Sequence, residues 1–195
     1  MASFISLVPD SARQSSSPSP TVLELIEAQR CADPSALALV HVDAGCPPVC
    51  MSYEQLLCQA RRAAGSLRAH GGGGAGSRIA LLCDEAPQLV VAFLAIAISA
   101  AVVVPIDPGA PHARMVSLLL DCGASLVLCD RAWMPAIASK LRDEGGTPTL
   151  SLPVVAVEDL ASSSLGAAED WPPPTGACEC HLVYTSGSTG RPKAV

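Results

Sequence analysis

The stretch with the clearest chemical character is Thr185–Lys193, which reads TSGSTGRPK and lies close to the end of the 195-residue chain. It holds four hydroxyl side chains, two glycines, an arginine and a lysine, and it has no carboxylate. Glycines let a backbone approach a ligand with its N–H groups turned inward, hydroxyls rotate to fit oxygen atoms, and Lys193 adds a compact positive charge. The stretch therefore predicts a loop that binds a polyphosphate, with a Gly/Ser linker or a surface turn as the competing interpretation.

The residues predicted to contact phosphate share a hydroxyl, backbone-amide or ammonium donor. They are Thr185, Ser186, Gly187, Ser188, Thr189, Gly190 and Lys193. The apolar residues 181–185 (HLVYT) are predicted to form a strand that leads into this loop. Such a strand would deliver the loop to the carboxyl edge of a sheet, where open α/β sheets bind ligands.

A second glycine-rich stretch, residues 71–76 (GGGGAG), fits the pattern G-x-G-x-x-G. A dinucleotide-binding turn follows a strand and opens a helix, whereas this stretch follows a predicted helix and precedes a predicted strand. Neither it nor residues 187–193 has the G-x-x-x-x-G-K-[ST] spacing of a P-loop. We therefore interpret residues 71–76 as a connector.

The cysteines raise the question of a metal site, because Cys46 lies near Cys50, and Cys178 and Cys180 precede His181. Paired zinc ligands usually have two to four residues between them. The single residue between Cys178 and Cys180 fits that spacing badly, and two prolines stiffen the first pair. No metal site is predicted.

The longest apolar run, residues 89–106, has no charged residue and is long enough to be a candidate membrane span. Its first part, from Pro87, is rich in alanine and leucine and is typical of a buried helix. Its second part, AAVVVPI, is β-branched and stops at Pro105, as a buried strand does. No lysine or arginine cluster flanks either end, so we predict a helix followed by a strand.

The rest of the chain also alternates between apolar strands and helices, which predicts a three-layer α/β fold with a mainly parallel sheet and helices on both faces. The predicted strands are residues 35–42, 78–83, 102–106, 125–130, 153–159 and 181–185. The predicted helices are residues 52–70, 87–99, 111–121 and 131–143. Ser52 is placed to cap the first of these helices, with Gln55 three residues later.

Composition narrows the function classes. Charged residues are 15% of the chain, the net charge is −6 and aromatics are only 3%, which disfavours a nucleic-acid surface. The N-terminus lacks the pattern of a secretory signal, so we expect reduced cysteines and a cytoplasmic location, with transit to an organelle as an open alternative. Residues 1–20, rich in serine and proline, are predicted to be a disordered tail, and residues 21–195 to be one domain.

Three segments resemble the adenylate-forming superfamily, which includes acyl-CoA synthetases, luciferases and the adenylation domains of non-ribosomal peptide synthetases. YTSGSTGRPKAV resembles the phosphate-binding signature of that family. Residues 102–130, beginning VVVPIDPGAPHAR, resemble its segment VPIDP, two residues, Pro, two residues and Arg. Residues 51–71 are similar to its opening helix. The three segments occur in the family's order. The sequence of the second resembles amino-acid-activating domains more than long-chain fatty acyl-CoA ligases.

The resemblance implies an ATP-dependent ligase. A carboxylic or amino acid attacks the α-phosphate of ATP to give an acyl-adenylate and pyrophosphate, and a thiol, either CoA or carrier-protein phosphopantetheine, then takes the acyl group. Thr185–Lys193 would bind the β- and γ-phosphates, with Lys193 as the catalytic cation. The family's Mg²⁺ ligand, its acyl pocket and its C-terminal lysine come after this loop, so we expect them outside the chain.

Two hypotheses follow. In the first, the chain is the N-terminal part of an adenylation domain, truncated after the phosphate loop and inactive alone. In the second, it is a non-catalytic nucleotide-binding or scaffold remnant. The sequence also departs from the family pattern at two places: Ala194 replaces the usual glycine after the loop lysine, and Ala100 and Ala101 replace a frequent glycine pair. We expect the alanine pair to affect helix–strand packing more than chemistry.

Overall fold

The computed structural model describes residues 20–84, 87–142, 150–162, 179–185 and 193–194. All but the last residue of the predicted disordered tail therefore lies outside the described residues. The centre of the fold is a four-stranded parallel sheet of β3 (Arg78–Leu82), β4 (Val102–Pro105), β5 (Leu126–Cys129) and β6 (Val154–Ala156), in the order β4-β3-β5-β6. The predicted parallel sheet is confirmed.

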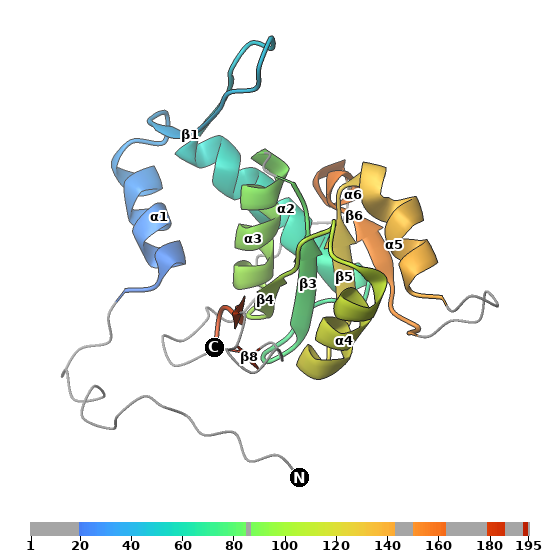
Figure 1. The fold of residues 1–195 in the computed structure, drawn as a ribbon. Coiled ribbons are helices and arrows are strands. Elements are labelled where there is room, and N and C mark those ends of the chain that lie inside the picture. Colours follow the sequence, from blue (N-terminus) through green and yellow to red (C-terminus); the bar gives the residue numbers. More distant parts are fainter. Residues whose placement is uncertain (1–19, 85–86, 143–149, 163–178, 186–192, 195) are drawn as a thin grey trace.

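Helices cover both faces of this sheet, which makes the three predicted layers (Figure 1). One face packs against α2 (Tyr53–Ala69), α3 (Pro87–Ile98) and α6 (Val157–Ser162). The other packs against α4 (His112–Cys122) and α5 (Met134–Lys140), which follows the short 3-10 helix η2 (Arg131–Trp133).

Alternation along each strand divides the core into two clusters. In β3, Ile79 and Leu81 point into the cluster under α2 and α3, while Ala80 and Leu82 point into the cluster under α4 and α5. Successive side chains of a strand face opposite sides of the sheet, so a strand buried on both sides must be apolar throughout. This requirement explains the unbroken apolar runs in the sequence.

The apolar run of residues 89–106 divides as predicted, into α3 and β4. The turn between them contains Ala100 with φ +53°, the one non-glycine residue in the described part of the chain with a positive φ. Within the same described ranges, no helix combines the length and the apolar character that crossing a membrane requires.

The N-terminal part adds α1 (Val22–Ala32) and an antiparallel pair, β1 (Leu37–His41) with β2 (Val49–Ser52), which does not join the parallel sheet. α1 has no buried residue and is connected to α2 by ion pairs of Glu27 with Arg61 and of Arg30 with Glu54. Ser52 caps α2, and both hydrogen bonds of the capping box with Gln55 are present.

Two predicted elements differ from the structure. The strand predicted over residues 153–159 ends at Ala156, because α6 begins at Val157 and carries Glu158 and Asp159 in its first turn, where the helix dipole favours acidic side chains. The helix predicted over residues 131–143 is divided into η2 and α5 and ends at Lys140.

Candidate functional site

The segment that leads to the predicted phosphate loop lies beside β4, the edge strand of the sheet. The Val103 N–H donates to the Cys180 carbonyl at 3.0 Å, and the Leu182 N–H donates to the Val103 carbonyl at 2.9 Å. The resulting bridge between Val103 and His181 is parallel. Because this segment runs parallel to β4, it continues past the carboxyl end of that strand.

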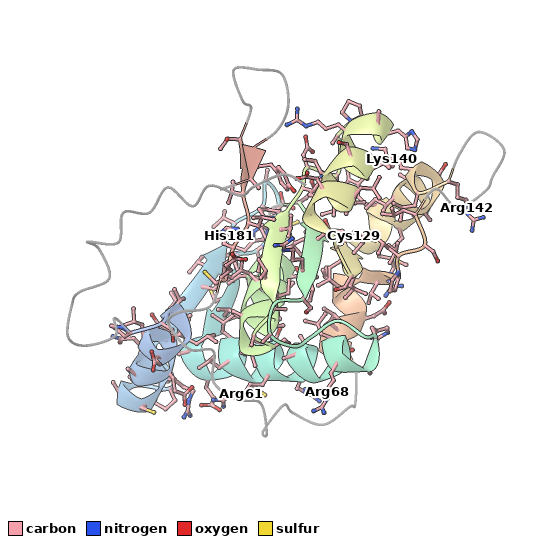
Figure 2. All side chains as sticks on the ribbon, turned by 90° about the horizontal axis from the view of Figure 1, so that it is seen from below. Arg61, Arg68, Cys129, Lys140, Arg142 and His181 are labelled. Carbon is pink, nitrogen blue, oxygen red and sulfur yellow. The ribbon has the colours of Figure 1, made fainter. Side chains whose placement is uncertain are left out.

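The side chains of this segment alternate between the two faces of the sheet. The His181 ring meets the Phe93 ring of α3 edge-on, with ring centroids 5.4 Å apart. Leu182 and Tyr184 pack on the opposite face, against the cluster under α4 and α5. Figure 2 labels His181 beside the sheet. The segment is therefore held from both faces as well as through its backbone.

The predicted strand over residues 181–185 is only partly regular. After the bridge at His181, it forms β7 (Tyr184–Thr185), which pairs antiparallel with β8 (Lys193–Ala194) instead of with the sheet. Tyr184 lies opposite Ala194, and Thr185 lies opposite Lys193. The structure thus brings together the first and last of the predicted phosphate-binding residues.

The other predicted contacts, Ser186, Gly187, Ser188, Thr189 and Gly190, lie outside the described residues. So does the Lys193 side chain, although its backbone is placed in β8. Thr185 is exposed at the end of β7. The phosphate site therefore remains a prediction for which the structure supplies the two ends.

Tyr184 connects this hairpin to α4. Its hydroxyl donates to Oδ2 of Asp121 at 2.6 Å, across 63 positions of sequence. Partial burial, together with the Asp121 carboxylate that accepts the hydrogen bond, raises the pKa of the Tyr184 phenol above its ordinary value. This pair could not be predicted from the sequence, because Asp121 has only the pattern of a polar residue near the end of a predicted helix.

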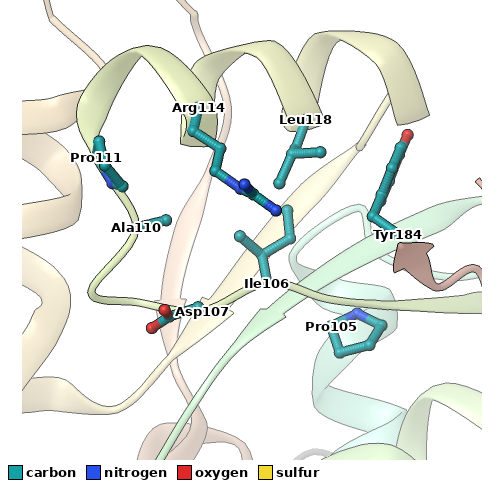
Figure 3. A pocket seen from close by; sticks show the side chains of 8 residues that line it. All are labelled: Pro105, Ile106, Asp107, Ala110, Pro111, Arg114, Leu118 and Tyr184. Carbon is teal, nitrogen blue, oxygen red and sulfur yellow. The ribbon is translucent and has the colours of Figure 1, made fainter. Parts of the chain in front are cut away.

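A pocket of about 310 Å³ opens between the β4–α4 connection and Tyr184 (Figure 3). Polar and apolar surface contribute about equally to its walls, and its charged residues are Asp107 and Arg114. Oδ1 of Asp107 accepts the Gly109 N–H at 2.8 Å. Arg114, the arginine of the VPIDP…P…R segment, extends from α4 towards the pocket in Figure 3.

Two cysteines inside the apolar runs, Cys83 and Cys129, pack in the two core clusters. Cys129 is fully buried in β5, and burial raises the pKa of its thiol to about 12. Burial likewise raises the pKa of Cys83. Across the described residues, which exclude Cys178, no group of three or more histidine, cysteine or acidic side chains is arranged to hold a metal ion.

Residues 27–195 match the family of AMP-binding enzymes, and the chain belongs to that family. It is 35% identical over 175 residues to phosphinothricin tripeptide synthetase PhsB from Streptomyces viridochromogenes, covering 88% of this chain and 13% of that protein. The first curated relatives that it matches are longer still, so that the chain spans only 3% to 4% of their length.

Solved structures agree on the fold. The N-terminal subdomain of NpsA from Klebsiella oxytoca is similar with a TM-score of 0.71 at 22% identity, covering 89% of this chain and 41% of that one. A fatty acyl-adenylate ligase from L. pneumophila, solved with acyl adenylate and pyrophosphate, is similar with a TM-score of 0.66 at 25% identity, covering 89% and 29%. The chain is therefore part of an adenylate-forming domain like those of non-ribosomal peptide synthetases.

Proposed function

We propose that this chain contributes the phosphate-binding loop of an ATP-dependent, carboxylate-activating ligase, with residues 185–193 around the β- and γ-phosphates of ATP. The observation that carries the proposal is the pairing of Thr185 with Lys193 beyond the carboxyl end of β4. This pairing supports a loop formed by the residues between its two ends, and open α/β sheets bind ligands at the carboxyl edge of their strands.

The chemistry assigned to the loop is electrostatic. As the bond between the α- and β-phosphates breaks, negative charge grows on the leaving pyrophosphate, and donors already in place stabilise the transition state. Lys193 would supply the full positive charge. The hydroxyls of Thr185, Ser186, Ser188 and Thr189, with the amides of Gly187 and Gly190, would share the remaining oxygens.

The other participants follow from the same reaction. A carboxylic or amino acid is the substrate, and a thiol of CoA or of a carrier-protein phosphopantetheine accepts the acyl group from the adenylate. Mg²⁺ would neutralise phosphate charge, and we assign none of its ligands to this chain. The competing proposal is a non-catalytic nucleotide-binding remnant. Adenylate formation distinguishes the two proposals. A non-catalytic remnant would bind pyrophosphate, but the full-length protein would form no adenylate.

Substitution of Lys193 tests the proposal. In the full-length enzyme, Lys193→Ala should lower the rate of adenylate formation by about 100-fold, the usual effect of losing one donor to developing charge. An interaction made mainly in the transition state lowers kcat when it is lost. Lys193→Arg should restore only part of the rate, since a broad planar guanidinium replaces a compact ammonium poorly.

The measurement is single-turnover adenylate formation at saturating ATP. Arg62→Met, which removes an exposed cation from α2, is the matched control and should leave the rate unchanged. If Lys193→Ala changes only the KM for ATP, the loop anchors the nucleotide and has no part in the chemical step. Wild-type enzyme that forms no adenylate with any acid would favour the non-catalytic remnant.

A further inference from the structure

Tyr184 is the residue immediately before Thr185–Lys193, and its side chain extends towards α4 (Figure 3). The ring packs against the cluster under α4 and α5 and lines the pocket that contains Asp107 and Arg114. Its hydroxyl reaches Asp121. The ring and the hydroxyl of a residue that begins the hairpin are therefore both in contact with the α/β core.

Asp121 occupies an unfavourable position for an anion. It is the penultimate residue of α4, where the helix dipole repels negative charge. Two donors lie at this helix end: the Tyr184 hydroxyl, at 2.6 Å from Oδ2 of Asp121, and the Arg78 guanidinium, at 2.8 Å from the Cys122 carbonyl. The Tyr184 hydroxyl thus offsets a charge that α4 alone would leave without compensation.

The segment before the hairpin has attachments of its own. The Val103 N–H donates to the Cys180 carbonyl, and the Leu182 N–H donates to the Val103 carbonyl, both ahead of β7. The ring contact of His181 with Phe93 also lies before β7. Tyr184 follows these contacts, and its side chain packs against the core within the hairpin itself. Its phenol therefore extends the attachment of the segment from Leu182 into β7.

We infer that Tyr184 is a positioning residue, which fixes the entry to the phosphate loop by hydrogen bonding its hydroxyl to Asp121 of α4. The inference rests on the proposed function, because it concerns the same loop. The Tyr184 hydroxyl is engaged with Asp121, so Tyr184 acts through the backbone of β7, whose partner strand contains Lys193. The pair Tyr184–Asp121 therefore couples the end of α4 to the placement of the loop cation.

The hydrogen bond itself can be measured by spectroscopy, because the chain has only two tyrosines. In a Tyr53→Phe background, Tyr184 is the sole phenol, and its ionisation can be followed by ultraviolet absorbance. We expect it to ionise above the ordinary value of about 10, and Asp121→Ala to move it down, because the accepting carboxylate is then lost. A titration unchanged by Asp121→Ala would contradict the bond, and a structural role alone would not produce this shift.

The effect on the loop is measured with inorganic pyrophosphate, titrated into the 195-residue chain by calorimetry. Tyr184→Phe should weaken binding by roughly 3- to 10-fold, the range expected for loss of an ordinary hydrogen bond, because this bond is exposed to solvent. Asp121→Ala should do the same, and the double variant should be no weaker than either single one, because the two residues act through one bond. Additive losses would contradict the coupling.

Trp133→Phe is the matched control, since it also removes one hydrogen bond from an aromatic donor to a carboxylate, that of Trp133 Nε1 to Asp84 at 2.9 Å. It should leave pyrophosphate affinity unchanged. Equal losses in Trp133→Phe and Tyr184→Phe would mean that general destabilisation explains the effect. If wild type binds pyrophosphate and Tyr184→Phe binds it equally well, the positioning role is wrong while the proposed function stands.

If wild type does not bind pyrophosphate, the proposed function fails, and hydrogen exchange then decides the positioning role separately. We expect the amides of Thr185 and Ala194 to exchange faster in Tyr184→Phe than in Trp133→Phe, because the hairpin has lost its attachment to α4. Equal exchange in the two variants would overturn the inference without reference to any ligand.

Discussion

The parallel sheet and the β7–β8 hairpin are built in opposite ways. The strands of the sheet are apolar except for Arg78 at the start of β3, and every residue of β5 is fully buried between helices on both faces. The hairpin consists of two residues in each strand, carries polar side chains and is attached by a few specific contacts. The sheet therefore determines the stability of the fold, while the position of the candidate site depends on a small number of interactions.

The strongest test of this contrast is a cavity in the sheet. Leu128→Ala, at a fully buried position in β5, should lower the free energy of unfolding by about 2–5 kcal/mol, because it removes burial and leaves a cavity. Urea unfolding followed by circular dichroism measures this loss. Leu120→Ala, at a residue of α4 that is 59% exposed, is the control and should cost far less. Similar losses in both would show that the sheet is not the source of stability.

The turn between α3 and β4 should respond with a smaller change of opposite sign. Ala100 has φ +53°, a left-handed conformation that costs a residue with a Cβ roughly 1–2 kcal/mol. Ala100→Gly should therefore stabilise the chain by about 0.5–1 kcal/mol, after the greater flexibility of glycine in the unfolded state is subtracted. Ala101→Gly, at a buried residue, should destabilise it instead. A stabilising Ala101→Gly would contradict this explanation.

At alkaline pH the sheet and the hairpin should lose stability over different pH ranges, because each contains a different titrating group. The thiol of Cys129 in the sheet has its pKa raised to about 12, and the phenol of Tyr184 in the hairpin also has its pKa raised. A group whose pKa is higher when folded contributes stability below its unfolded pKa, and this stability is lost as pH rises towards the folded value. The contribution of Cys129 should thus fall from about pH 8.5, and that of Tyr184 from about pH 10.

The measurement is the free energy of unfolding at a series of pH values for wild type, Cys129→Ala and Tyr184→Phe. Each variant should lose stability less steeply than wild type within the range of its own group. The change in Tyr184→Phe is the smallest of the expected effects, since Tyr184 is only partly buried. Parallel curves for all three proteins would show that neither group is coupled to folding.

Much of the fold could be predicted from the sequence, because strands that are buried on both faces appear in it as unbroken apolar runs. The run of residues 89–106 was separable into α3 and β4 by the change from alanine and leucine to β-branched residues. The boundary at Ala156 was missed, because Val157 is apolar enough to continue a strand and only tertiary packing starts α6 there.

The sequence predicted a loop at the candidate site, but it did not predict how the hairpin is attached to α4. The composition of Thr185–Lys193 indicated the chemistry, and pairing of its two ends agrees with a closed loop. The attachment of Tyr184 to Asp121 was not predictable, since a single hydrogen bond between residues 63 positions apart leaves no periodicity in the sequence. Resemblance to the family identified Arg114 as part of a motif, and only the structure placed it at a pocket with Tyr184.

The bridge between Val103 and His181 also sets an order of events during folding. The segment that carries the phosphate loop can dock only onto an edge strand that already exists, and β4 pairs with β3 to become that edge. Closing so long a stretch of chain is slow relative to forming neighbouring elements. The parallel sheet should therefore assemble first and the hairpin last, so that a folding chain completes the proposed phosphate site only in the final step.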